Sequence, residues 1–257
     1  MVYIISELCG QWGGSIRRAE QMILQSKLAG ADAVKVQLWD TYRMPGADRH
    51  KWEYLHIEKK DLKRLQDFSK NLNIDFFASA FHFDRYEWLK ELDIKTNKLA
   101  SIVLSEKFKH LADTMVLDDH FQKNYISLGM WDKKELPYPQ QEKNVYFHCV
   151  PEYPHTFKRA IDLMPARFEE SGIHGYSDHV TGIEACKEAI KRGAVYIEKH
   201  FTIDRSLQCK TEAAHACSMD FSDLKELRTF CDIERNKARE SQTETLFLKE
   251  LTENSKS

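Results

Sequence analysis

IEACKEAIKRGAVYIEKH, residues 183–200, contains one complete helix-to-strand unit of this chain. Apolar residues in Ile183–Arg192 recur at the spacing of an amphipathic helix, and Gly193 ends that pattern. Ala194–His200 then has the apolar character of a strand that is covered on both faces. The stretch therefore predicts a helix followed by a strand of a buried parallel sheet.

The same unit recurs along the chain. The predicted strands are Tyr3–Glu7, Ala33–Leu38, Asp75–Ala80, Lys95–Ala100, Asn124–Gly129, Val145–Val150, Gly172–Ser177 and Ala194–His200. The clearest helical patterns are Ile16–Ala29, Asp61–Asn71, Asp84–Glu91, Phe157–Phe168, Ile183–Arg192 and Ser222–Arg235, the last with Ser222 as a candidate N-cap. Eight such units in 257 residues favour an α/β fold of the (β/α)8 TIM-barrel type. The glycines after the first strand lack the GxGxxG spacing of a dinucleotide-binding sheet.

Two regions depart from the repeating pattern. Trp131–Pro139 contains prolines where the helix after the fifth strand should run, so we expect that helix to be missing or reduced to a turn. We place the barrel domain at residues 1–235 and a polar C-terminal tail, with some helical character, at residues 236–257. A small apolar patch in the tail leaves two interpretations open, a solvated helix or a docking helix for another subunit.

Composition excludes several classes of protein. Lys and Arg number 38 and Asp and Glu 40, so a net charge of −2 gives no reason to expect nucleic acid or a membrane surface as partner. No apolar run reaches the length of a membrane span, and the N-terminal residues do not resemble a signal peptide. The six cysteines include no CxxC pair and are expected to be reduced thiols. We therefore expect a cytoplasmic enzyme.

Polar residues gather at the carboxyl ends of the predicted strands, where barrel enzymes place their active sites. Residues two apart on a strand share a face, as do Lys35 with Gln37, Ser177 with His179, and Glu198 with His200. Other polar residues at these ends are Glu7, Ser79, Lys98, Ser101 and Ser127.

These residue types indicate two kinds of chemistry. Two lysines with several hydroxyls can bind a compact polyanion such as a phosphorylated carboxylate. His179 and His200 can hold a divalent metal that keeps open positions for water, unlike the four-ligand structural zinc sites. Each residue alone has a more ordinary interpretation: a lysine at a strand end is often solvated, and His148 and His215 fit structural roles. The pattern alone predicts a barrel enzyme for an anionic substrate.

Several motifs together resemble the sialic acid (N-acetylneuraminate) synthase family. They are residues 29–37 (AGADAVKVQ), Lys98–Ser101, Ser127–Met130, His148–Cys149 with Tyr153–Pro154, Gly175–His179 (GYSDH) and Glu198–Thr202 (EKHFT). Their order matches the family from Glu7 to about Ser218. The resemblance implies a metal-dependent condensation of phosphoenolpyruvate with an aldose, N-acetylmannosamine or a related sugar, to give a 3-deoxy-2-keto sugar acid and phosphate.

The resemblance also implies roles for single residues. His179 and His200 would hold the metal, Mn²⁺ by preference and Mg²⁺ or Co²⁺ as alternatives. Phosphoenolpyruvate would be bound by Lys35, Ser79, Lys98, Ser101, Ser127 and Ser177. Glu7 and Gln37 match positions near the metal and the sugar, and Tyr153 matches a contact of the acceptor. We therefore count Glu7, Lys35, His179 and His200 as candidate catalytic residues.

The chain departs from the family on the acceptor side. Gln11-Trp12 replaces an Asn-His pair, Val103 replaces a glutamate and Ala214 replaces a sugar-contacting aspartate. The loop Asp204–Glu212, which contains Lys210, is longer than usual. The sequence also ends at Ser257, before the antifreeze-like domain with which relatives dimerise, so a homo-oligomer would need another interface.

Two other functions stay open from the sequence. An aldolase or lyase for an anionic keto acid would use Lys35 or Lys98 as a Schiff base, which requires a lysine of lowered pKa. A non-catalytic barrel that binds phosphoenolpyruvate or a sugar would explain Val103 and Ala214. The candidate metal ligands and Glu7 favour an enzyme over that last interpretation.

Overall fold

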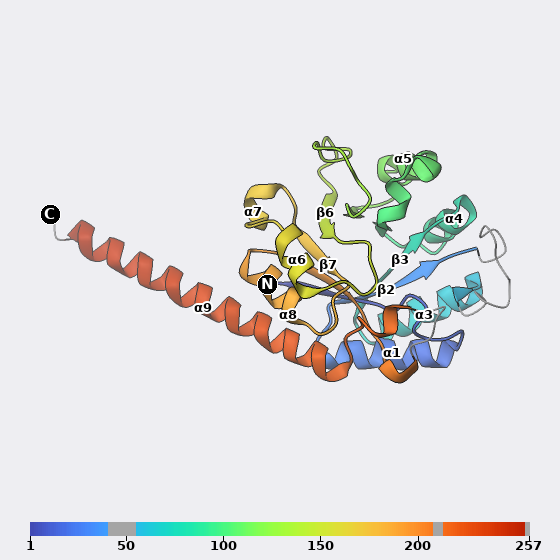
Figure 1. Cartoon of the computed structure of the whole chain (residues 1–257), viewed down its shortest axis with the longest axis horizontal. Helices are drawn as coiled ribbons and strands as arrows, with labels where there is room; N and C mark the ends of the chain where they lie inside the picture. The colour runs from blue at the N-terminus through green and yellow to red at the C-terminus, as the bar shows by residue number, and fades with distance from the viewer. Residues whose placement is uncertain (41–54, 208–212, 255–257) are drawn as a thin grey trace.

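Eight parallel strands close into a barrel in chain order, with β8 pairing back to β1 (Figure 1). This is seen in a computed structural model that describes residues 1–40, 55–207 and 213–254, with some side chains of the last helix left out. The strands are β1 (Tyr3–Glu7), β2 (Ala33–Leu38), β3 (Asp75–Ala80), β4 (Thr96–Leu99), β5 (Lys123–Ser127), β6 (Asn144–Cys149), β7 (Gly175–Asp178) and β8 (Tyr196–His200). The predicted TIM barrel is confirmed.

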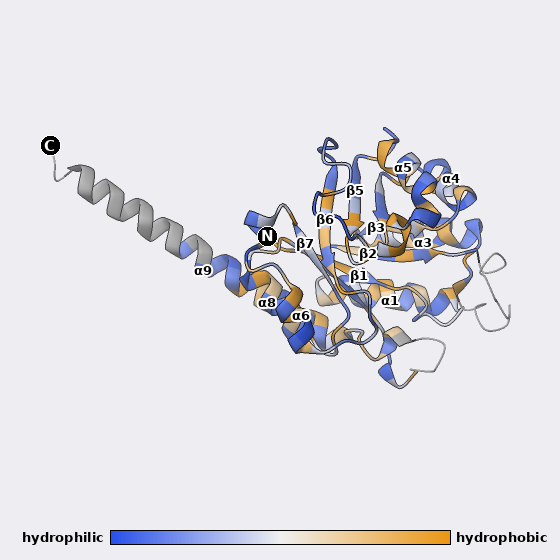
Figure 2. Ribbon diagram, turned by 45° about the horizontal axis from the view of Figure 1, so that its top comes forward, coloured by the Kyte–Doolittle hydropathy of each residue, from blue (hydrophilic) through white to orange (hydrophobic). Residues whose placement is uncertain are grey.

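Helices cover the outer face of the barrel. They are α1 (Ile16–Ala29), α3 (Lys59–Asn71), α4 (Phe83–Glu91), α5 (Lys109–Leu117), α6 (Phe157–Leu163), α7 (Phe168–Ser171), α8 (Glu184–Lys191) and α9 (Phe221–Asn254). The helices packed on the barrel carry both hydrophobic and hydrophilic residues (Figure 2). In α1 the buried residues Ala19, Met22, Ile23 and Ser26 recur every three or four positions, which places one stripe of the helix against the sheet.

The irregular fifth unit is confirmed. Residues 128–143, between β5 and β6, contain turns and no helix. The predicted helix Phe157–Phe168 is interrupted, because Pro165 separates α6 from α7. Helix α5 was missed by the sequence patterns.

Asp220, and not Ser222, caps helix α9. The Asp220 Oδ1 atom accepts hydrogen bonds from the backbone N–H groups of Ser222 at 2.9 Å and Asp223 at 3.0 Å. The backbone of α9 continues as a helix through residue 254 and extends away from the barrel (Figure 1).

Aromatic rings fill the barrel interior below the carboxyl ends of the strands. Tyr125 contacts Phe77, Phe147 and Tyr196 with ring centroids 5.3–5.5 Å apart. Gly175 leaves the space that these rings need, because a Cβ atom there would lie 2.8 Å from Phe147 and Tyr196. This layer of rings fills the barrel interior, so we expect a ligand to bind at the carboxyl ends of the strands.

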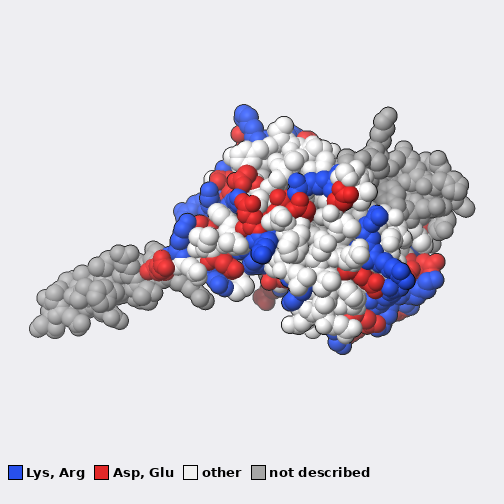
Figure 3. All heavy atoms as spheres, turned by 90° about the horizontal axis from the view of Figure 1, so that it is seen from below, with Lys and Arg blue, Asp and Glu red and all other residues white. Residues whose placement is uncertain are grey.

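The surface carries both signs of charge. Basic and acidic residues are interspersed on the face shown in Figure 3. Many charged residues of the protein are paired, as Lys187 is with Glu184 and Glu226. Within the described residues, none of the helices has the length and apolar character to cross a bilayer. The described cysteines are free thiols, and Cys209 lies outside the described residues.

Candidate active site

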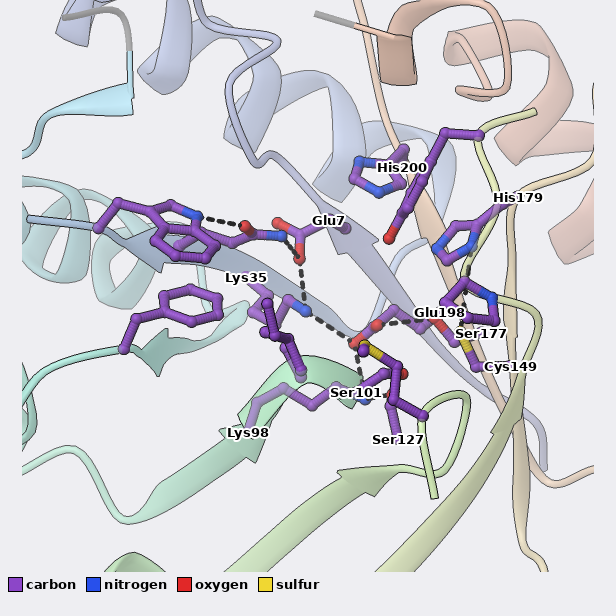
Figure 4. Close-up of a pocket in the computed structure, with 18 residues that line it drawn as sticks. Glu7, Lys35, Lys98, Ser101, Ser127, Cys149, Ser177, His179, Glu198 and His200 are labelled. Atoms are coloured by element: carbon purple, nitrogen blue, oxygen red, sulfur yellow. Dashed lines mark hydrogen bonds and ion pairs between the residues drawn. The ribbon is translucent and has the colours of Figure 1, made fainter. Parts of the chain in front are cut away.

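A cavity of about 260 Å³ opens at the carboxyl ends of the strands (Figure 4). The predicted site residues that line it are Glu7, Lys35, Gln37, Lys98, Ser101, Ser127, Tyr153, Ser177, His179 and His200. With them are Trp39, Phe81, Ala100, Ile102, Met130, Cys149, Pro151 and Glu198. The strand ends that the sequence identified therefore do converge on one site.

Glu198 joins the two lysines at the floor of the cavity. Its Oε2 atom lies 3.2 Å from Lys35 Nζ and 3.3 Å from Lys98 Nζ. Its Oε1 atom accepts a hydrogen bond of 3.0 Å from the Ser177 hydroxyl, and Lys98 donates one of 2.7 Å to Ser127 Oγ. Both cations are thus fixed inside the barrel, where an entering anion would meet them.

The two lysines differ in pKa because their neighbours differ. Burial lowers the pKa of Lys98 to about 8, with only partial compensation from Glu198. Burial acts on Lys35 too, but Glu198 and Glu7 outweigh it and raise the pKa of Lys35 above its ordinary value. Although burial opposes ionisation of Glu198, the two lysines lower its pKa to about 2. Lys35 and Glu198 are therefore charged at neutral pH.

Glu7, at the end of β1, contacts Lys35 and Gln37 of the neighbouring strand β2. It forms an ion pair with Lys35 and accepts hydrogen bonds from Gln37 Nε2 at 3.2 Å and from the Cys9 backbone N–H at 2.7 Å. Trp39 Nε1 in turn donates to Gln37 Oε1 at 2.8 Å. Burial and the nearby Glu198 raise the pKa of Glu7, against the effect of Lys35. A carboxyl group of raised pKa is suited to proton transfer.

Ser79 is the predicted site residue that does not reach the cavity. It pairs with Gln37 across β2 and β3 and so lies on the inner face, as predicted. Its short side chain is fully buried, and among the described residues its hydroxyl has no hydrogen-bond partner. Strand parity indicates the face of a residue and not whether its side chain is long enough to border a cavity.

His179 and His200 lie next to each other at the cavity wall, with ring centroids 5.6 Å apart (Figure 4). His179 Nδ1 bonds the Val150 carbonyl at 2.7 Å, and His200 Nδ1 bonds Gln11 Oε1 at 3.1 Å. A carbonyl oxygen only accepts, so Nδ1 carries the proton and Nε2 keeps its lone pair. Burial lowers the pKa of His179 to about 4 and lowers that of His200 as well, so both rings are neutral at pH 7.

This pair has the properties of ligands for a metal with open coordination positions. Neutral imidazoles whose Nδ1–H groups are bound to oxygen atoms are the usual form of metal-ligating histidine. Among the described residues, no cluster of three or more His, Cys, Asp or Glu side chains is arranged to hold an ion. The residues therefore fit an ion held by two imidazoles with water or substrate at its other positions, and not a closed zinc site.

Tyr153 covers the imidazoles from the loop after β6. Its ring centroid lies 3.9 Å from that of His179 and 5.7 Å from that of His200. The side chain is 46% exposed, so it stands at the mouth of the cavity rather than in the core. The contact of Tyr153 with the acceptor, which the resemblance implies, stays a prediction.

Comparison with known proteins identifies the family of this chain. Residues 22–241 match the model of the NeuB family. The chain belongs to the NeuB family. It is 31% identical to the N-acetylneuraminate-9-phosphate synthase of Drosophila melanogaster, over 89% of this chain and 66% of that protein. It is 27% identical to the N,N'-diacetyllegionaminic acid synthase of Legionella pneumophila, over 88% of this chain and 70% of that protein.

A solved structure shares the fold over nearly the whole chain. The N-acetylneuraminic acid synthetase of Leptospira borgpetersenii, crystallised with citrate, superposes with a TM-score of 0.75 at 26% identity, over 92% of this chain and 85% of that one. The chain spans about two thirds of the length of the curated NeuB relatives named above.

None of the described residues that depart from the family pattern lines the cavity. Val103 is fully buried and packs in an apolar cluster with Phe81 and Leu99, so it does not line the cavity. Ala214 is buried in the short helical turn Ala213–His215 and does not line the cavity either. Gln11 provides an oxygen for His200 Nδ1. Lys210 lies outside the described residues.

Sequence reasoning assigned no role to two ionisable residues of the NeuB site. Glu198 was noted for sharing a face with His200 and as part of the EKHFT motif, but its contacts with the two lysines were not predicted. Cys149 lines the cavity between Ser101 and Ser177, and burial raises the pKa of its thiol to about 11. It is therefore a protonated wall residue and not a nucleophile.

Proposed function

We propose that this chain condenses phosphoenolpyruvate with an aldose, N-acetylmannosamine or a related sugar, to give a sialic-acid-type 3-deoxy-2-keto acid and phosphate. One observation carries the proposal: two buried lysines with hydroxyls at the cavity floor lie beside two neutral imidazoles on the cavity wall. Phosphoenolpyruvate needs cations and hydroxyls for its phosphate and carboxylate. The names of the relatives support the same reaction.

Lys35, Lys98 and the hydroxyls of Ser101, Ser127 and Ser177 would hold phosphoenolpyruvate. Fixed cations at the buried end keep its phosphate and carboxylate away from water and leave the methylene carbon facing the mouth. Lys98 lies 4.1 Å above the Phe147 ring, which helps to hold its ammonium group in place.

His179 and His200 would hold a divalent ion, by preference Mn²⁺, which when bound supplies Lewis acidity toward the aldehyde oxygen. Tyr153 and Gln37 would orient the open-chain aldose above phosphoenolpyruvate. A carbon–carbon bond then forms between the methylene carbon and the aldehyde carbon. Water adds at C2, and the C–O bond to phosphate breaks. We assign to Glu7 the proton that water loses and the new hydroxyl gains.

Phosphate release tests this proposal. Purified protein with Mn²⁺ and phosphoenolpyruvate is incubated with a panel of aldoses, including N-acetylmannosamine and phosphorylated sugars. We expect release that depends on both the aldose and the ion. Binding of phosphoenolpyruvate without release from any aldose would instead support the non-catalytic barrel.

The low pKa of Lys98 favours one second candidate, a Schiff-base aldolase or lyase. A lysine with a pKa of about 8 is partly neutral at pH 7.5 and can attack a keto acid. Borohydride treatment in the presence of pyruvate distinguishes the two functions by mass spectrometry. A covalent adduct on Lys98 would support the second candidate, whereas its absence with aldose-dependent phosphate release supports the first.

A further inference from the structure

Directly behind the two imidazoles, on the outer face of β7 and β8, lies a buried ion pair. Asp178 precedes His179, Lys199 precedes His200, and the two are paired across the strands. Lys199 Nζ contacts Asp178 Oδ2, and neither side chain is accessible to solvent. Because side chains alternate along a strand, this pair points toward the helices while the imidazoles point toward the cavity.

The pair clamps the backbone on both sides of His179. Asp178 Oδ1 accepts hydrogen bonds from the Tyr176 hydroxyl at 2.7 Å and from the Val180 backbone N–H at 3.1 Å. Lys199 also reaches across from β8 and donates a hydrogen bond of 2.6 Å to the Val180 carbonyl. His179 lies between two residues that are both tied to the strand that carries His200.

Stability alone gives little reason for such a pair. Taking two charges out of water largely offsets their attraction, and apolar replacement of buried ion pairs is often neutral. A directional contact between the two strands, by contrast, fixes the separation of the residues that follow it. Metal affinity depends strongly on how the groups behind the ligands orient them.

We propose that Asp178 and Lys199 are positioning residues that set the separation of His179 and His200 and thereby the affinity for a divalent ion. The inference rests on the metal site of the proposed function. Neither residue lines the cavity, so both act through the imidazoles and not on a substrate.

The double variant Asp178→Asn with Lys199→Met tests this role. It removes both charges together and keeps an acceptor for Tyr176 and Val180. It also removes the hydrogen bond from Lys199 to the Val180 carbonyl. Titration of protein with Mn²⁺ alone, followed by electron paramagnetic resonance of the free ion, measures affinity without any substrate. We expect binding at least about tenfold weaker than in the wild type.

A second ion pair provides the matched control. Asp32 and Arg228 join the start of β2 to α9, and Arg228 also bonds the Val2 and Gly30 carbonyls, far from the imidazoles. The double variant Asp32→Asn with Arg228→Met should lose thermal stability and keep wild-type Mn²⁺ affinity. Tyr176→Phe, which keeps both charges and removes one donor to Asp178, is a milder variant and should weaken Mn²⁺ binding less than the double variant does.

Each outcome is decisive. Wild-type Mn²⁺ affinity in Tyr176→Phe and in the folded Asp178/Lys199 variant, or equal losses in the Asp32/Arg228 control, would overturn the inference. A wild-type protein that binds no Mn²⁺ would overturn it together with the metal site. A wild-type protein that binds Mn²⁺ but releases no phosphate would remove the proposed reaction and leave the positioning role standing.

Discussion

At the scale of single residues, the cavity floor is a group of buried charges, each of which needs an opposite charge beside it to remain ionised. Lys35, Lys98 and Glu198 are each in contact with an opposite charge, and Glu7 completes the group. Removing one partner from such an array leaves a buried charge without compensation, which is strongly destabilising. In the proposed function, Lys35 and Lys98 of this array would bind the anionic substrate.

The lowered pKa of Lys98 predicts a pH-dependent affinity for phosphoenolpyruvate. Below its pKa of about 8 the lysine is charged and attracts the anion, and above it the charge is lost. Glu198 and Lys35 face the same ammonium group and stay ionised over this range. We expect calorimetric binding to weaken about tenfold between pH 7 and pH 9, since each pH unit above the pKa removes tenfold of the protonated form.

Lys98→Arg is the control for that prediction. Arginine stays charged at both pH values, so the variant should bind phosphoenolpyruvate with nearly equal affinity at pH 7 and pH 9. A wild-type affinity that does not change over this range, or a variant that retains the full pH dependence, would contradict the assignment of this pH dependence to Lys98.

His200→Ala tests the metal ligand. Loss of one of two imidazoles should weaken Mn²⁺ binding by more than about 100-fold. The free energy of unfolding should fall by only about 1–2 kcal/mol, the usual effect of truncating one neutral side chain. His120→Ala is the control, because the His120 ring, like that of His200, is bonded to an oxygen atom, here the Ile94 carbonyl, but does not line the cavity. Unchanged Mn²⁺ affinity in His200→Ala would remove the ligand assignment.

Residue-level prediction succeeded where strand parity decided the outcome. Lys35 with Gln37 and Ser177 with His179 line the cavity because residues two apart share a face. Ser79 shows the limit, since its distance from the cavity depends on side-chain length and on neighbouring strands. Gln11 shows another limit: its contact with His200 joins residues at opposite ends of the chain, and no local pattern contains it.

At the scale of helices and strands, the periodicity of apolar residues predicted most elements, and glycines and prolines indicated where they end. Predicted and observed strands differ by a few residues at most, as for Gly172–Ser177 and β7. Helix α5 was not predicted because it follows two short helical turns, Ser101–Leu104 and Glu106–Phe108, which interrupt the apolar periodicity of a single helix. The prolines correctly predicted the missing helix after β5.

The start of α9 gives a prediction at this scale. Asp220→Ala removes the carboxylate that accepts from two backbone N–H groups, so the free energy of unfolding should fall by about 1 kcal/mol. Ser222→Ala should change it by less than about 0.5 kcal/mol, because Ser222 lies inside the helix. Urea unfolding of both variants measures the difference. A larger loss of unfolding free energy in Ser222→Ala than in Asp220→Ala would show that Ser222, the candidate from the sequence, is the N-cap.

At the scale of the whole molecule, barrel closure brings the two halves of the site together. The lysines, Ser127 and Glu198 at the cavity floor come from β2, β4, β5 and β8, while the imidazoles come from the residue after β7 and from the end of β8. The repeating helix–strand unit was enough to predict this closure, and the strand ends were enough to place the site. The identity of the acceptor was not predictable, because it depends on loop side chains whose arrangement no sequence period encodes.

The fate of the bridging oxygen of phosphoenolpyruvate tests the central claim most directly. Protein, Mn²⁺, an accepted aldose and phosphoenolpyruvate labelled with ¹⁸O at the C–O–P bridge are incubated together, and the phosphate is analysed by mass spectrometry. We predict phosphate that forms only with the aldose and carries the label, because the C–O bond breaks. Unlabelled phosphate, or release that does not depend on the aldose, would contradict condensation at this site.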